Sequence, residues 1–95
     1  MKNKKMKTDE AAPASYALSD FYLAAYLIAE GLPLLRLDPA GGSRVLFVLE
    51  DSPRREALIQ DFYGHRAGVD PLTYKNAIVD LKSLIHGLRR ERSKP

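Results

Sequence analysis

Two histidines, His65 and His86, are the side chains able to act as bases near neutral pH. His65 lies in a glycine-flanked loop between Asp61 and Asp70, and a histidine held by a carboxylate is a common form of general base. An exposed loop histidine explains the same pattern, and no nucleophile accompanies it. His86 has no histidine or carboxylate three or four residues away, so the helical spacing of a metal-ligand pair is missing. We therefore expect no catalytic residue, no metal and no cofactor.

Other reactive groups are also missing from the sequence. The chain contains no cysteine, which excludes a disulfide scaffold, a thiolate metal site and a cysteine nucleophile. Gly41-Gly42-Ser43 has the glycines of a phosphate loop without its lysine or its strand-to-helix context. A hairpin turn accounts for these glycines. These patterns favour a protein that is not an enzyme and has no small-molecule substrate.

Positive charge is concentrated at the two ends of the 95-residue chain, whose formal net charge is +3. Residues 1–7 carry four lysines and no acid, and residues 88–95 carry four basic residues against one glutamate. The stretch 8–87 holds eleven acidic and seven basic residues. Basic ends contact phosphate without sequence preference, and they equally keep a small protein soluble. The charge distribution alone therefore does not establish nucleic-acid binding.

The segment after Pro71 carries a basic pattern of its own. Lys75, Lys82 and Arg89 recur every seven residues, and Arg90 adjoins them. In a helix this spacing defines one positive face, which we place opposite the apolar stripe, and such a face can enter a major groove. A solvated helix face explains it as well, and residues 64–69 are longer than a helix-turn-helix turn. We keep these four residues as a possible nucleic-acid contact.

The first predicted helix follows a cap at Ser19 and ends at Gly31, with Pro33 beyond. It is apolar nearly all round, so it needs cover on more than one side, and in a short chain a second subunit can provide it. We expect one part of this helix to face the domain core and another part to form a subunit interface. The expected interface residues are Tyr22, Ala25, Tyr26 and Ala29. Accordingly, Tyr22→Glu with Tyr26→Glu is expected to leave the domain folded and to disrupt its association.

The remaining elements complete an α+β domain in the order helix, β-hairpin, helix, helix. Strands are predicted at 34–37 and 44–50, joined by a type I turn at 38–41, after a short extended entry at 15–18. Ser52-Pro53 and Asp70-Pro71 open helices over about 53–63 and 71–90. The compact domain is expected at 15–88, between a disordered basic tail at 1–14 and a basic tail at 89–95. The last helix has an apolar stripe of Tyr74, Ala77, Leu81, Leu84 and Leu88, flanked by Ile78 and Ile85.

Three parts of the chain resemble a family of small bacterial domains catalogued as a domain of unknown function. The matching stretches are 18–27, 45–51, and Asp70-Pro71-Leu72 with Asn76-Ala77 and 81–84. The resemblance covers roughly residues 15–86 and implies a compact domain whose role is interaction. It implies no reaction or ligand. The polar residues inside the matching stretches include Asp20, Asn76 and Lys82.

The leading hypothesis is therefore a non-enzymatic interaction module that self-associates as a homo-oligomer or binds a protein partner. The alternative is a nucleic-acid-binding accessory protein that uses the basic helix face and the basic tails. The apolar run from Phe21 to Ala29 is far shorter than the roughly 20 residues of a membrane span, so no membrane contact is expected. We expect a cytoplasmic location.

Overall fold

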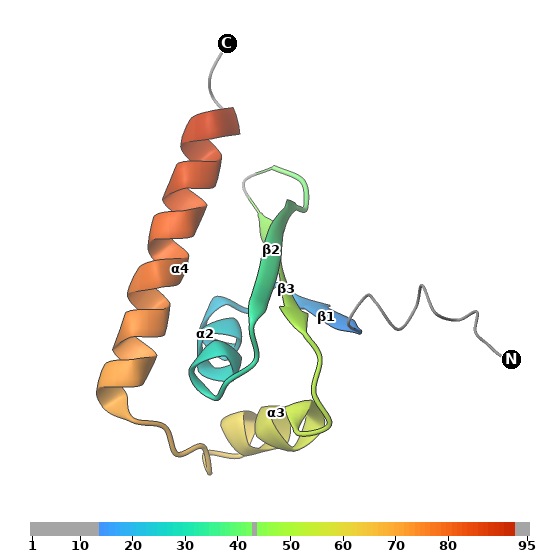
Figure 1. The fold of residues 1–95 in the computed structure, drawn as a ribbon, viewed down its shortest axis with the longest axis vertical. Helices are drawn as coiled ribbons and strands as arrows, with labels where there is room; N and C mark the ends of the chain where they lie inside the picture. The colour runs from blue at the N-terminus through green and yellow to red at the C-terminus, as the bar shows by residue number, and fades with distance from the viewer. Residues whose placement is uncertain (1–13, 43, 93–95) are drawn as a thin grey trace, which may run out of the picture.

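The computed structural model describes residues 14–42 and 44–92, and within them it has three helices and one three-stranded antiparallel sheet (Figure 1). This confirms the α+β class and the predicted order of elements, with one strand added in front. The proposed N-terminal tail lies outside the described residues, except for Ala14. The elements are β1 (Ser15–Leu18), α2 (Phe21–Ala29), β2 (Leu34–Pro39), β3 (Val45–Glu50), α3 (Arg55–Tyr63) and α4 (Pro71–Arg92).

The strand order in the sheet is β1-β3-β2, so β3 is the central strand. Its register sets Phe47 opposite Leu18 and Leu37, and Leu49 opposite Tyr16. A central strand suits the most apolar segment of the chain, because its backbone pairs on both edges and its side chains are buried. Residues 15–18, expected as an extended entry, form the third strand that the hairpin needed for stability.

The predicted turn over residues 38–41 is wrong. Asp38 and Pro39 extend β2, and Pro39 pairs with Val45. The turn closes later, where Ala40 N–H donates to the Arg44 carbonyl over 3.0 Å. Proline is tolerated here because β2 is an edge strand, whose outer side needs no donor.

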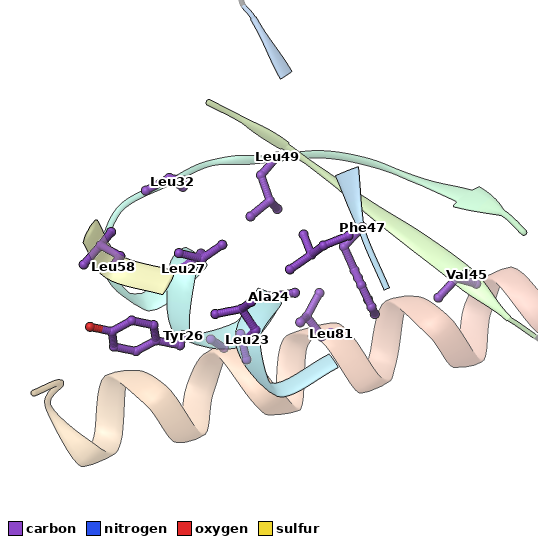
Figure 2. Packing of buried hydrophobic residues seen from close by; sticks show 13 residues of the cluster. Leu23, Ala24, Tyr26, Leu27, Leu32, Val45, Phe47, Leu49, Leu58 and Leu81 are labelled. Carbon is purple, nitrogen blue, oxygen red and sulfur yellow. The ribbon is translucent and has the colours of Figure 1, made fainter. Parts of the chain in front are cut away.

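Helix α2 is the central layer of the domain. Asp20, rather than the expected Ser19, is its cap: Leu23 N–H donates to Asp20 Oδ1 over 3.1 Å. The helix ends before Gly31, whose φ of +108° favours glycine, as predicted. The sheet packs on one side of α2, α4 packs on another, and α3 packs against it as well (Figures 1 and 2). Residues 23–27 are all buried, so the chain itself covers the helix that was expected to need a second subunit.

Helix α4 packs on α2 through Ala77 and Leu81, which are its fully buried residues, and Figure 2 shows Leu81 beside α2. Tyr74, Ile78, Ile85 and Leu88 are partly buried around them. The expected inclusion of Leu84 in this stripe is wrong, because its side chain is 47% exposed. The buried side of α4 includes Leu81 and Ile85, which is four residues later. Leu84 comes one residue before Ile85 and therefore lies about 100° around the helix from it.

The helix boundaries of α3 and α4 differ slightly from the expected ones. Helix α3 begins at Arg55, two residues after Pro53, while Ser52 Oγ accepts the Arg54 N–H over 3.1 Å. Helix α4 begins at Pro71 as predicted, and Asp70 caps it by accepting the Thr73 N–H over 2.8 Å. It continues to Arg92, so the first part of the expected C-terminal tail is helical. No helix within residues 14–42 or 44–92 is long and apolar enough to cross a membrane.

Candidate functional site

The histidines lie on the surface of the domain. His65 follows α3 with a φ of +61°, and its N–H donates to the Phe62 carbonyl over 3.4 Å. His86 is exposed on α4. In the described part of the chain, no three side chains of the histidine, cysteine, aspartate or glutamate type gather as a possible metal site. The geometry supplies no assembled catalytic group around either histidine.

The four residues expected at a subunit interface on α2 do not share one surface. Tyr22 is 55% exposed, whereas Tyr26 is 2% exposed and Ala25 is fully buried. Ala29 is half-buried. The expectation of an exposed Tyr22–Tyr26 patch is therefore wrong, because α2 crosses α4 and α3 on the side where a second subunit was expected.

Tyr26 packs against α3. Its ring lies 5.5 Å from the Phe62 ring, centre to centre, at a tilt of 35°. Burial is the main reason that the pKa of Tyr26 is raised, and the nearby carboxylates of Glu30 and Asp61 raise it further. The surroundings of Tyr26 thus oppose a negative charge at this position.

A polar cluster at the start of α2 joins three helices, and sequence analysis did not find it. Tyr63 of α3 donates its hydroxyl to Asp20 Oδ2 over 2.8 Å, and Tyr74 of α4 donates to the Tyr22 carbonyl over 3.2 Å. The hydrogen bond to Asp20 raises the pKa of Tyr63. Asp20 also caps α2, so one carboxylate serves both the helix and the α3 contact. The spacing of 43 residues between the partners explains why no local sequence signal indicates this cluster.

A second polar cluster joins the sheet to the start of α3. Arg55 Nε lies 3.0 Å from Asp51 Oδ1, and a second guanidinium nitrogen lies 3.3 Å from Oδ2. The same guanidinium sits 4.0 Å from the centre of the Tyr16 ring on β1. Asp51 and Arg55 border an open depression of about 410 Å³ together with Ala14 and Ser52. The Arg55 guanidinium contacts both the Asp51 carboxylate and the Tyr16 ring, so we interpret this cluster as structural.

This cluster predicts acid sensitivity. The hydrogen bond from Arg55, followed by the one from the Ser52 backbone, lowers the pKa of Asp51 from its ordinary 3.8. A carboxyl group with a lowered pKa in the folded state stabilises the fold above its unfolded pKa, and this stability is lost as the pH falls through the folded pKa. We expect Asp51→Asn to reduce the difference between the urea midpoints measured at pH 7 and at pH 3.

Asp80→Asn is the matched control at concentrations where the protein is monomeric, because Asp80 is exposed and makes no side-chain hydrogen bond with any described residue of its own chain. If acidification lowers the urea midpoint of Asp51→Asn as much as that of the wild-type protein, Asp51 is not the source of the acid sensitivity.

Several large apolar side chains of α4 are exposed to solvent. Leu72, Val79 and Leu84 are 61%, 49% and 47% exposed. They are three of the six large hydrophobic residues exposed in the described part of the chain. A row of every fourth residue, Leu72, Asn76, Asp80 and Leu84, runs along the helix, and all four are exposed. We call these four residues the outer row, and Val79 lies beside it.

A groove lies on the other side of α4, where its C-terminal part faces the start of β3. The groove measures about 310 Å³ and is lined by apolar side chains, by Ser19 and by two arginines, Arg44 and Arg89. Ile85, on the buried side of α4, lines it too. The basic residues of α4 were expected opposite the buried stripe, but Arg89 lies at the edge of that stripe, because it follows Ile85 by four residues.

The other basic residues predicted on this helix face, Lys75, Lys82 and Arg90, do not line the groove. Lys75 and Lys82 are exposed on the Arg89 side of the helix, as their seven-residue spacing predicts, but they do not line the groove. Arg90 is exposed as well, about 100° around the helix from Arg89. No local sequence pattern indicates Arg44, which is 45 residues from Arg89 in the chain and is brought to the groove by the fold.

Comparison with known proteins gives one match. A family model described as Domain of unknown function (DUF5659) matches residues 13–87. The sequence matches no curated protein and no solved structure. The matched range contains the outer row and Arg44, and it ends two residues before Arg89.

Proposed function

Because the chain belongs to the DUF5659 family of domains of unknown function, we propose its role from its own surface: a non-enzymatic interaction module that self-associates through α4. One observation carries this proposal. Half of the large hydrophobic residues exposed in the described part of the chain belong to one helix, α4. Exposed apolar side chains concentrated on one element favour a protein contact.

The outer row has a self-complementary order. Read in either direction, leucine stands at both ends, and the two inner positions are an amide and a carboxylate. Two copies of α4 that cross antiparallel near residue 78 set Leu72 of one copy beside Leu84 of the other. The same crossing sets the Asn76 amide, a donor, beside the Asp80 carboxylate, an acceptor.

This pairing suits ordinary helix geometry and symmetry. Residues four apart form a ridge on a helix, and two such ridges interlock in the commonest class of helix packing. A twofold pair uses the same surface on both copies, so one row provides both halves of the contact. Asn76 and Asp80 make no side-chain hydrogen bond with any described residue of their own chain, which supports a role for them in such a contact.

Self-association is tested by sedimentation velocity of the full chain over a range of concentrations. We expect Leu72→Glu and Leu84→Glu to give monomers with unchanged circular dichroism, because both side chains are exposed in the single chain. Leu35→Glu is the matched control, since Leu35 is 40% exposed on β2, away from the outer row. A monomeric wild-type protein at all concentrations, or equal dissociation of the Leu35→Glu control, overturns the proposal.

An exchange of charges tests the antiparallel register itself. Asn76→Asp sets two carboxylates against each other across the pair and is expected to weaken association about tenfold, the equivalent of roughly 1.4 kcal/mol. The double variant Asn76→Asp with Asp80→Asn exchanges the two groups and is expected to restore association. Failure of the double variant to associate more tightly than Asn76→Asp contradicts the register.

Nucleic-acid binding is the second candidate function. The observation that favours it is the approach of Arg44 to Arg89, which extends the basic side of α4 towards the hairpin. The excess of acidic residues over residues 8–87 opposes it, since phosphate contacts dominate nucleic-acid affinity.

A further inference from the structure

We infer that the groove between α4 and the start of β3 binds an acidic protein segment that carries apolar side chains next to its carboxylates. We call it the Arg44–Arg89 groove. This inference goes beyond self-association, because the groove and the outer row lie on different sides of α4. Three features support it: the origin of the groove, the chemistry of its floor and the charge of its rim.

The groove arises from unequal helix lengths. Helix α2 has nine residues and spans about 13 Å, whereas α4 has 22 residues and spans about 33 Å. Helix α4 therefore continues past the start of α2 at Phe21, where no helix separates it from the sheet. In Figure 1 the C-terminal part of α4 and the β2–β3 hairpin extend beyond α2 in the same direction. The groove lies between them, with Phe21, Phe47 and Ile85 among its lining residues.

The floor of the groove is apolar. Val45 and Phe47 are almost fully buried, and they also belong to the main core, which fixes their positions. Phe21 lies with its ring 6.1 Å from the Phe47 ring, centre to centre, and is half-buried. Phe21 and Ile85 keep part of their apolar surface exposed at the groove, so a partner that covers them with apolar groups gains free energy by removing both surfaces from water.

The rim of the groove is positively charged. Arg44 stands at the start of β3 and Arg89 on α4, and both are exposed. Among the residues whose side chains the structure describes, no aspartate or glutamate lines the groove. A guanidinium group binds a carboxylate through two parallel hydrogen bonds, and it is less strongly hydrated than an ammonium group. The rim is thus complementary to carboxylates held beside apolar side chains.

Two other occupants fit these observations less well. Nucleic-acid phosphates gain nothing from an apolar floor, and the acidic body of the chain repels them. If a second copy inserted its outer row into the groove, one copy would contribute the groove side of its α4 and the other copy would contribute the outer row. Such a head-to-tail contact extends into an open chain rather than closing into a pair. A separate acidic, partly apolar segment is the occupant that both the floor and the rim favour.

The test is fluorescence anisotropy of a short labelled peptide of leucine, glutamate and glycine, titrated with the full-length chain. We expect binding to the wild-type protein and at least about tenfold weaker binding to Arg44→Glu and to Arg89→Glu, one unit of log affinity each. Lys75→Glu is the matched control, because it makes the same charge change on the same side of α4 outside the groove. We expect this control to bind the peptide as the wild-type protein does.

Control probes decide between this inference and a general charge attraction. Replacing leucine by serine in the peptide, or glutamate by lysine, is expected to abolish binding. Equal binding of the serine peptide, equal weakening by Lys75→Glu, or tighter binding of duplex DNA with the same dependence on Arg44 and Arg89 overturns the inference. Sedimentation of the two arginine variants keeps the proposals distinct, since we expect their self-association through the outer row to be unchanged.

Discussion

Tyr26→Glu is expected to unfold the domain, whereas Tyr22→Glu, one helical turn earlier, is expected to leave it folded. Tyr26 is 2% exposed and packs on Phe62, so a carboxylate there is buried, and Arg54, whose charge acts on this site, already pairs with Glu30. Burial of an unpaired charge costs more than a domain of this size can absorb, since total stabilities are about 5–15 kcal/mol. Glu30 and Asp61, which already disfavour ionisation of Tyr26, add repulsion. The Tyr22 side chain is 55% exposed, so a charge at this position remains solvated.

Circular dichroism with urea titration measures this contrast. Tyr26→Phe is the control, because it keeps the ring that contacts Phe62 and removes only the hydroxyl. We expect it to unfold close to the wild-type urea midpoint. A folded Tyr26→Glu variant with a wild-type midpoint contradicts the burial of this residue, and unfolding of Tyr22→Glu contradicts its exposure.

Leu81→Ala is expected to lower the free energy of unfolding by about 2–5 kcal/mol, and Leu84→Ala by about 0.5 kcal/mol or less. Leu81 is 1% exposed and, with Ala77, fixes α4 on α2, so truncation leaves a cavity where the helices cross. Leu84 is 47% exposed, and its removal leaves none. Both changes remove the same atoms from the same helix, so any difference in helix propensity cancels.

Urea titration of both variants measures the two free energies of unfolding. The titrations are run at concentrations where the protein is monomeric, because Leu84 belongs to the outer row and association adds apparent stability. Equal loss of stability in the two variants contradicts the packing of α4 described above.

The two contrasts bear on function because they separate core residues from surface residues. Self-association was first expected on α2, which is apolar all round, but that helix is covered by the sheet, α3 and α4 of its own chain. Exposed apolar residues remain on α4, which contacts α2 along one side. The proposed interface therefore belongs to the outer row, and variants of Leu72 and Leu84 test it without disturbing the core.

Elements whose signals are local could be predicted from the amino-acid sequence. Asp70-Pro71 opens α4 and Gly31 ends α2 where predicted, because capping and left-handed backbone depend on a few adjacent residues. The strand predicted at 44–50 is β3, and its alternating residues Val45, Phe47 and Leu49 are all in the main cluster. The α+β class follows from these elements.

Which surfaces remain exposed depends on contacts between residues that are far apart in the chain. Residues 15–18 became a strand through pairing with β3, some thirty residues away, and Tyr26 became a core residue through contact with α3. Leu84 lies outside the buried stripe because Leu81 and Ile85 pack against the core, whereas the Leu84 side chain is 47% exposed. Arg44 and Arg89 line one groove although no local pattern connects them. Helical periodicity indicates which apolar residues share a side of a helix. Which neighbouring element covers that side depends on long-range packing. The outer row and the Arg44–Arg89 groove are both consequences of this packing.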